Sequence, residues 1–230
     1  MAKANVLLCI LVCVGLVSTA SGEILITNGD FEADAIGGSQ DFADVAGWYE
    51  SDAGNFWETP WFKEGNDSFN GSAVVAFSGL SIGPAPDGAG VLSFIYQNIG
   101  TADGASQVQI GFQTGPFVGA PTRDYGITAT ILQSSSFVPG EEVDILGAAG
   151  VTVIDQQTRL YTGAAAADVK DDVWTLDLSS VAPGGGDLYL RLNFYHGAVN
   201  DAPFIHIDNV TIVAVVAPSP GSLGMLIYAR

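Results

Sequence analysis

Apolar and polar residues alternate along several stretches of this chain with a period of two. The alternation is clearest over residues 108–112, 174–178 and 188–195. This period is typical of β-strands that have one face in a core and one face in solvent, so we expect strands at these positions. Shorter apolar runs bounded by turn-forming residues predict further strands at residues 73–77, 92–97, 127–132 and 151–154.

Helical patterns are nearly absent from the chain. Residues 163–170, which include four alanines, are the one stretch that indicates a helical turn. Many short strands joined by Gly-rich turns predict an all-β antiparallel sandwich or barrel. We find no repeat and no change of composition that would divide the chain into several domains, so we expect one domain.

Two stretches near the ends of this domain each carry a carboxylate among residues expected to be buried. They are residues 24–32 and residues 204–212, and both are predicted to be strands. In the second stretch Ile205 and Ile207 share one face, whereas Val210 and Ile212 have the opposite parity. Because a slip of one residue turns every side chain to the other face, we expect a β-bulge at Asp208-Asn209, or a strand covered on both faces.

These two stretches carry a resemblance to a known family. The sequences Asn28-Gly29-Asp30-Phe31-Glu32 and Ile207-Asp208-Asn209-Val210 resemble the opening and closing strands of galactose-binding-like jelly-roll domains, which occur in many carbohydrate-binding modules. The resemblance covers most of residues 23–213. It implies an antiparallel jelly-roll β-sandwich whose first and last strands are neighbours, with carbohydrate as the ligand.

The same resemblance implies a structural calcium ion between the first and last strands. Its side-chain ligands would be Glu32 and Asp208, and backbone carbonyl groups would complete a shell of six to eight oxygens. The alternative is that Glu32 lies in solvent at a strand end and that neighbouring backbone N–H groups satisfy Asp208.

Residues 1–22 have the features of a secretory signal peptide: Lys3, an apolar run over residues 6–17, and small residues at 18–22. The run is shorter than the about 20 residues that a membrane span needs, so export is favoured over the alternative of a membrane anchor. Both cysteines, Cys9 and Cys13, lie in this run. We therefore expect a secreted domain without disulfides over residues 23–216, in a bacterial envelope or extracellular setting, with no stable membrane span in the mature protein.

The mature chain is strongly acidic. Without Lys3 it keeps 6 of the 7 basic residues and all 25 acidic residues, a net charge of −19. Such a surface repels nucleic acid and anionic membranes, which are bound through clustered Lys and Arg. It also offers many oxygen ligands to hard cations.

An aromatic segment is the candidate ligand site. Trp57 and Trp61 lie in an acidic, loop-like stretch with Tyr49 and Asn55 nearby. Flat rings stack on the C–H faces of sugars while amides and carboxylates bind the hydroxyl groups, which predicts a site for carbohydrate or exopolysaccharide. The alternative is that these rings cap the core, as we expect of Trp48.

Catalytic motifs are missing from the mature sequence. It has no cysteine nucleophile, Gly-x-Ser-x-Gly elbow, His-Glu-x-x-His motif or phosphate-binding Gly loop. The two histidines, His196 and His206, do not form a local metal pair, and we expect His206 to be packed in its strand. A non-catalytic binding module is therefore the leading interpretation. The alternatives are a structural envelope or matrix protein and, with less support, a glycoside hydrolase that uses two of the 25 acids.

Residues 217–230 follow the predicted domain as a tail. The sequence Ala217-Pro218-Ser219-Pro220, followed by an apolar stretch and Arg230, is similar to a degenerate PEP-CTERM sorting tail. It departs from that pattern at Ser219, where Glu is expected, in the short apolar stretch and in having a single basic residue. The alternative is an ordinary flexible C-terminus.

Overall fold

The computed structural model describes ten segments of the chain. They are residues 23–33, 40–41, 46–50, 61–63, 74–78, 94–116, 123–140, 143–164, 169–196 and 204–216. Eleven strands and no helices lie in these segments. None of the described residues belongs to a helix with the length and apolar character that a membrane crossing requires.

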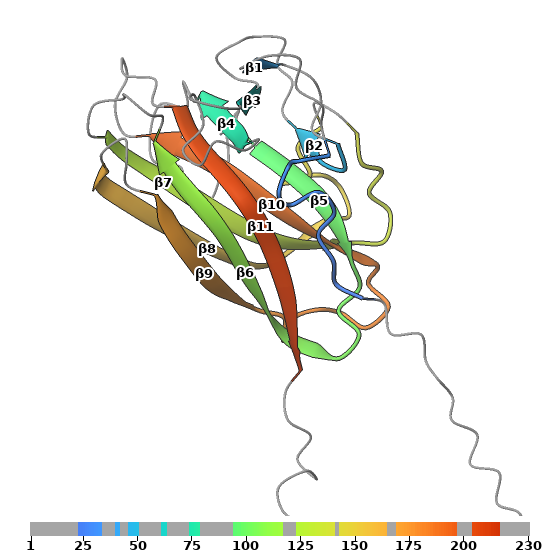
Figure 1. The fold of residues 1–230 in the computed structure, drawn as a ribbon. Coiled ribbons are helices and arrows are strands. Elements are labelled where there is room, and N and C mark those ends of the chain that lie inside the picture. The colour runs from blue at the N-terminus through green and yellow to red at the C-terminus, as the bar shows by residue number, and fades with distance from the viewer. Residues whose placement is uncertain are drawn as a thin grey trace, which may run out of the picture.

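The strands form two sheets, and every pair of neighbouring strands is antiparallel (Figure 1). The six-stranded sheet contains, in order, β1 (Gln40–Asp41), β3 (Trp61–Lys63), β4 (Val74–Ser78), β11 (Phe204–Val216), β6 (Ala105–Pro116) and β9 (Lys170–Asp177). The five-stranded sheet contains β2 (Tyr49–Glu50), β5 (Phe94–Gly100), β10 (Asp187–His196), β7 (Arg123–Ser134) and β8 (Thr152–Ala164). The predicted all-β antiparallel jelly-roll β-sandwich is confirmed.

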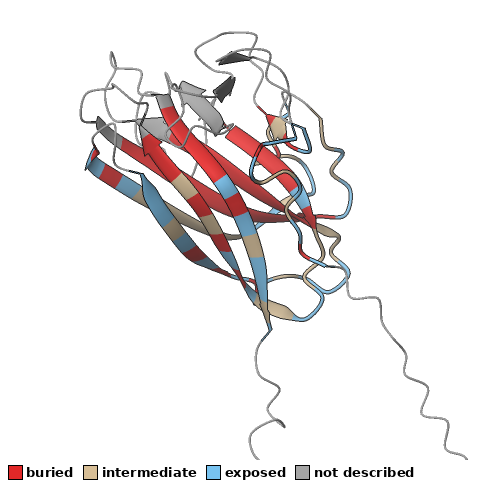
Figure 2. Ribbon diagram, in the orientation of Figure 1, coloured by how far each residue is buried: buried red, intermediate tan, exposed pale blue. Residues whose placement is uncertain are grey.

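The core lies between the two sheets. The inward residues of β6, β9 and β10 are large and apolar, among them Ile110, Trp174, Leu190 and Leu192, which are all at most 1% exposed. Along β6 and β9 these residues alternate with exposed ones (Figure 2), as the period of two predicts. Trp48 is buried as expected, and its indole Nε1 donates a hydrogen bond to the Asn28 carbonyl oxygen at 3.1 Å.

The predicted bulge in the last strand is confirmed. The register of β11 against β6 shifts between Asp208 and Thr211, and Asn209 has a φ of 53°. This extra residue puts Val210 back among the buried residues, as Ile205 and Ile207 are. His206 is also fully buried, as predicted, so this part of β11 is covered on both faces.

The prediction of an opening strand over residues 24–32 is wrong. Residues 23–26 belong to no sheet, and residues 27–30 form a bend followed by a turn. Asn28 and Phe31 have φ values of 49° and 54°, which a strand does not accommodate. The segment is nevertheless held in place, because the Leu25 N–H donates to the Ile99 carbonyl and the Val210 N–H donates to the Gly29 carbonyl.

Two other predictions need correction. The strand predicted at residues 151–154 extends to Ala164 as β8, because pairing with β7 continues through residues 155–159, where the sequence shows no apolar alternation. The predicted helical turn at residues 163–170 is wrong at both ends, where residues 163–164 belong to β8 and Lys170 begins β9. Residues 165–168 lie outside the described part of the chain.

Candidate functional site

The candidate site lies on the outer face of the five-stranded sheet. Along β10, Leu190 and Leu192 point into the core, so Arg191 and Asn193 point to the opposite face. The alternation in sequence predicted that this face meets solvent, but both side chains are 0% exposed. That prediction is wrong for β10, because part of the β7–β8 connection packs over the outer face of the sheet.

The register of the strands extends this site across the whole sheet. Arg191 lies opposite Tyr96 of β5 and Thr130 of β7, while Tyr96 lies opposite Tyr49 and Thr130 lies opposite Gln156. One row of side chains therefore crosses all five strands. A parallel row crosses four strands and consists of Phe94, Asn193, Thr128 and Thr158.

Each row is aromatic on the side of β2 and β5 and polar on the side of β10, β7 and β8. We call the polar part the polar band, and it consists of Thr128, Thr130, Gln156, Thr158, Arg191 and Asn193. On the aromatic side, the rings of Tyr49 and Tyr96 stack at 5.2 Å, with an interplanar angle of 22°. The Arg191 guanidinium carbon lies 4.7 Å from the centre of the Phe94 ring, which joins the two parts.

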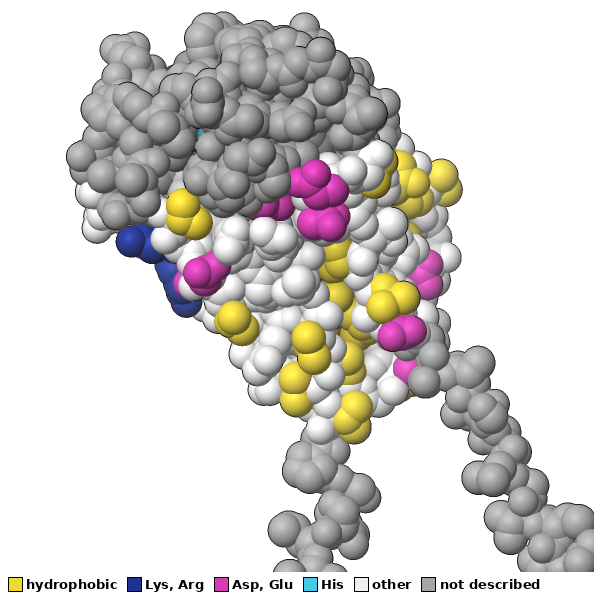
Figure 3. All heavy atoms as spheres, viewed as in Figure 1, with side chains coloured by type: hydrophobic (Ala, Val, Ile, Leu, Met, Phe, Trp, Pro, Cys, Tyr) yellow, Lys and Arg dark blue, Asp and Glu magenta, His cyan; other side chains and the backbone are white. Residues whose placement is uncertain are grey.

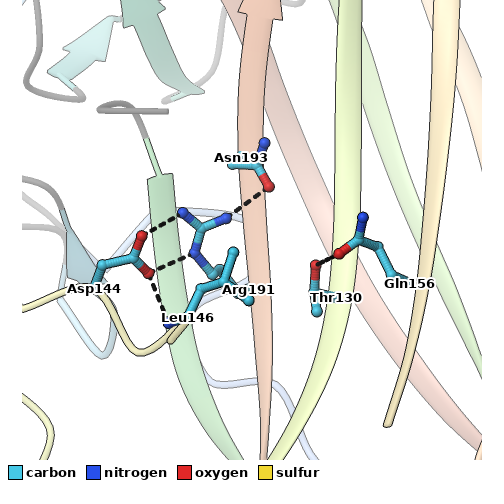
Figure 4. Close-up of polar contacts among 6 residues, drawn as sticks. All are labelled: Thr130, Asp144, Leu146, Gln156, Arg191 and Asn193. Carbon is cyan, nitrogen blue, oxygen red and sulfur yellow. Dashed lines mark hydrogen bonds and ion pairs between the residues drawn. The ribbon is translucent and has the colours of Figure 1, made fainter. Parts of the chain in front are cut away.

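Arg191 is held by a bidentate ion pair (Figure 4). Its Nε and Nη2 donate to the two carboxylate oxygens of Asp144 at 2.8 and 2.7 Å, and its Nη1 donates to the Asn193 Oδ1 at 2.7 Å. Asp144 comes from the β7–β8 connection, where the Leu146 N–H also donates to it. The Asp144 side chain is 31% exposed, so the ion pair reaches the surface of the molecule. Because the two charges compensate each other, this part of the polar band is electrically neutral.

The remaining polar groups form hydrogen bonds along the rows. The hydroxyl groups of Thr128 and Thr158 are 2.9 Å apart, and the Thr130 hydroxyl donates to the Gln156 Oε1 at 3.3 Å. The Asn193 Nδ2 is buried and has no acceptor among the residues that the structure describes. A buried amide donor is costly to leave without an acceptor, and this one lies beneath the surface of the site because Asn193 is 0% exposed.

The β7–β8 connection covers the end of the aromatic part. Tyr96 accepts a hydrogen bond from the Gly140 N–H and donates one to the Gly140 carbonyl, at 3.1 and 2.9 Å. Ile145 of the same connection is fully buried in a cluster with Phe94, Tyr96 and Tyr189. Burial, followed by the nearby Asp187 carboxylate, raises the pKa of Tyr189, which favours its neutral phenol.

The predicted ligand-binding residues fall in different parts of the molecule. Tyr49 is half-buried at the end of the longer row, so it belongs to the site. Trp61 begins β3, so its backbone lies in the six-stranded sheet, and its side chain lies outside the described part. Asn55 and Trp57 lie outside the described residues altogether. Arg191 and Asn193 were missed, although an arginine on the outward face of a strand is notable in a chain with seven basic residues.

The predicted calcium ligands lie in different environments. Asp208 is 1% exposed, and its carboxylate accepts hydrogen bonds from the Asn209 N–H at 2.6 Å and from the Asn209 Nδ2 at 3.1 Å. Glu32 is exposed. Among the residues described here, no three His, Cys, Asp or Glu side chains form a group that could hold a metal. Calcium at Glu32 and Asp208 would need backbone carbonyl groups for the rest of its shell, and it stays a prediction.

A second polar cluster joins the two sheets at β8 and β9. The Asp172 carboxylate accepts hydrogen bonds from the Arg159 guanidinium and the Tyr161 hydroxyl. Tyr161 stacks on Tyr125 at 4.6 Å, and Arg159 lies over the Trp174 ring at 5.3 Å. Burial, and then the hydrogen bond to the Asp172 carboxylate, raises the pKa of Tyr161 strongly. The cluster closes this edge of the sandwich.

The fold has counterparts among solved structures. An apo cyclase from Fischerella sp. matches 87% of this chain and 100% of its own length, at 17% identity and a TM-score of 0.54. A Stig cyclase from Fischerella sp. TAU matches 86% of this chain and 100% of its own length, at 17% identity and a TM-score of 0.52. A CBM4 structure matches 82% of this chain and 99% of its own length, at 17% identity and a TM-score of 0.46.

At these identities the two cyclases show the fold alone, and the CBM4 match is too distant to carry an argument. No protein-family model matches the chain. A comparison with curated protein sequences also finds no match. What the comparisons establish is an antiparallel β-sandwich fold.

Proposed function

We propose that this chain is an exported, non-catalytic binding module for carbohydrate, belonging to a bacterial surface or extracellular protein. One observation carries the proposal. Two rows of side chains cross the five-stranded sheet on its outer face, aromatic at one end and hydrogen-bonding at the other, and one buried amide donor in them lacks an acceptor within the described part of the chain.

The division into two parts matches the chemistry of a sugar. A pyranose ring has apolar C–H faces, which pack on aromatic rings such as Tyr49, and a rim of hydroxyl groups that both donate and accept hydrogen bonds. The polar band offers donors and acceptors of both kinds through Thr, Gln and Asn side chains. Since Asp144 neutralises Arg191 and the mature chain carries a charge of −19, the site favours uncharged glycans over acidic ones.

Glycan binding by the mature chain tests this proposal directly. A panel of soluble neutral oligosaccharides is screened first, and a binder is then titrated by calorimetry against variants of the polar band. Thr128→Val and Asn193→Ala are each expected to weaken binding by about 1–1.5 kcal/mol, roughly tenfold in Kd, because each removes a hydrogen-bonding group from the site.

Thr114→Val is the matched control for Thr128→Val. Thr114 is an equally buried threonine, but it lies in the six-stranded sheet and its hydroxyl donates to the His206 carbonyl. This variant is expected to keep the affinity of the unmodified chain, and melting curves of all three variants verify that they are folded. If no glycan binds, the proposal is wrong, and a structural envelope protein or an enzyme becomes the better interpretation.

Variants of Trp57 and Trp61, the predicted ligand-binding tryptophans, test separately where the glycan site lies. If glycans bind but only Trp57→Ala or Trp61→Ala weakens the binding, the function stands and the site lies at those residues. Stacking of either ring on a sugar is expected to contribute on the order of 1–3 kcal/mol. If both tryptophan variants instead lower the melting temperature by similar amounts, the two rings belong to the core.

A further inference from the structure

Among the described strands, the last strand of the domain has an open edge over about half its length. β4 pairs with β11 only from Phe204 to Ile207, and the Gly29 carbonyl accepts the Val210 N–H. From Thr211 to Val216, β11 continues to pair with β6 on its other side. Within the described part of the chain, no strand lies next to residues 211–216 on the side away from β6.

The direction of the backbone groups at this edge follows from the alternation along a strand. The Val210 N–H points away from β6, toward Gly29. Backbone N–H and C=O groups point the same way at every second residue, so those of Ile212 and Ala214 also point to the open side. An open edge of this kind is a template for pairing with another extended segment.

A groove of about 510 Å³ lies along this edge. Its opposite wall is formed by residues 23–25, and its lining is mostly apolar, with Ile24, Leu25 and Ile212 among the residues that contribute. Leu25, Val213 and Val216 are 52%, 57% and 67% exposed. Figure 1 shows the first described residues and the end of β11 at the same end of the sandwich, and Figure 3 shows hydrophobic side chains gathered there.

We propose that residues 223–229 of this chain occupy the groove as an added strand, antiparallel to β11. Residues 217–222 would form the connection, and their two prolines and one glycine suit a turn of this length. In the resulting register Leu223, Met225 and Ile227 lie opposite Val216, Ala214 and Ile212. This inference does not depend on the proposed carbohydrate function.

The side-chain pattern of the segment fits the groove. Ile212 and Ala214 pair with the inward residues Ile110 and Val108 of β6, so their side chains lie on the core side of the sheet. The three residues opposite this side in the added strand, Leu223, Met225 and Ile227, are all apolar. No acidic residue follows Asp208 in the sequence, so the segment brings no repulsive side chain to a groove lined by Glu23 and Asp103.

Disulfide trapping tests the proposed register, because the chain after residue 22 contains no cysteine. Val213→Cys with Leu226→Cys places the two thiols opposite each other on the outer face, where a disulfide can form at the Cα separation of adjacent strands. Val213→Cys with Ile227→Cys is the matched control, because Ile227 would point to the other face. We expect an intramolecular disulfide in the first pair and little in the second.

A second pair of variants tests the groove without cysteines. Met225→Asp would place a carboxylate among the apolar groove residues and is expected to lower the melting temperature. Leu226→Asp, one residue along on the outer face, is expected to leave it nearly unchanged. Equal disulfide yields in the two cysteine pairs, or equal melting temperatures of the two aspartate variants, would overturn the proposal. Disulfide-linked dimers in place of an intramolecular bond would assign the groove to a second copy of the chain.

Discussion

Arg191 and Asp172 show how this protein keeps charged side chains away from water. Arg191 is fully buried and is paired with both oxygens of Asp144, while the Asp172 carboxylate receives hydrogen bonds from Arg159 and Tyr161. A buried charge is tolerated only with such partners, because the cost of removing it from water is several kcal/mol. The Arg191 pair ties β10 to the β7–β8 connection, 47 residues away in sequence, whereas the Asp172 group ties β9 to the preceding strand β8.

Tyr161 is expected to make the stability depend on alkaline pH. Its pKa is raised in the folded state by burial and by the Asp172 carboxylate, whereas an unfolded tyrosine ionises near pH 10. The resulting stabilisation is fully present below about pH 10 and is lost as the pH rises further. We expect Tyr161→Phe to cost about 1 kcal/mol at pH 7, as a donor to Asp172 is lost, and to reduce the alkaline loss of stability.

Urea unfolding of the unmodified chain and of the Tyr161→Phe variant, at neutral pH and at about pH 10.5, measures this effect. The absorbance of tyrosinate reports the ionisation directly. An identical alkaline loss of stability in the two proteins would assign it to other tyrosines.

At the scale of single elements, β11 combines a bulge, a contact with the opening segment and an open edge. Its bulge reverses the parity of its side chains, so that residues on both sides of Asp208 face the core. It also contacts the opening segment, where Gly29 is required because an added Cβ would lie 1.9 Å from the Val210 carbonyl oxygen. The bulge, the contact with Gly29 and the open edge beyond it therefore all depend on one short stretch of this strand.

The bulge predicts a specific order of stability for variants of Asn209. Its φ of 53° is left-handed, which costs most residues about 1–2 kcal/mol and costs glycine almost nothing. Asn209→Ala and Asn209→Gly both remove the hydrogen bond from the Asn209 Nδ2 to the Gln113 Oε1. The difference between them therefore isolates the backbone conformation, and we expect the glycine variant to be more stable by about 1 kcal/mol in urea unfolding. Equal stabilities would show that the bulge relaxes without cost.

At the scale of the whole molecule, the two ends of the domain meet. The opening segment donates to β5 through Leu25 and accepts from β11 through Gly29, so it spans the edge between the two sheets. A ligand that joins Glu32 to Asp208 would strengthen this closure. Residues 23–230 contain no cysteine, so no disulfide within them can do so.

We expect calcium removal to lower the melting temperature if Glu32 and Asp208 bind the ion. An ion bound only by the folded state stabilises it by about 2.7 kcal/mol when its free concentration is a hundred times the Kd. Asp208→Asn or Glu32→Gln should remove most of the difference between melting curves with calcium and with excess chelator. Asp103→Asn, on the turn between β5 and β6, is the control and should retain it. Melting curves that chelator does not change would rule out this calcium site.

Local patterns in the sequence determined the class of the fold and most of its strands. The period of two is a property of each strand by itself, so β6, β9 and β10 can be recognised before their partners are known. The parity change in β11 likewise predicted the bulge at Asp208-Asn209, since the requirement for a buried face leaves few other solutions. The burial of Trp48 and His206 followed from the same reasoning.

The tertiary structure alone determined which residues and segments are neighbours in the fold. Arg191, Tyr96 and Tyr49 share a row because of strand register, and their separations in sequence give no sign of it. Similarly, the outer face of β10 is buried because a distant connection packs over it, and the opening stretch is held by single hydrogen bonds without joining a sheet. The alternation of apolar and polar residues indicates which residues share a face of a strand. The partners of that face are set by the free energy of packing the whole chain, to which every strand and connection contributes.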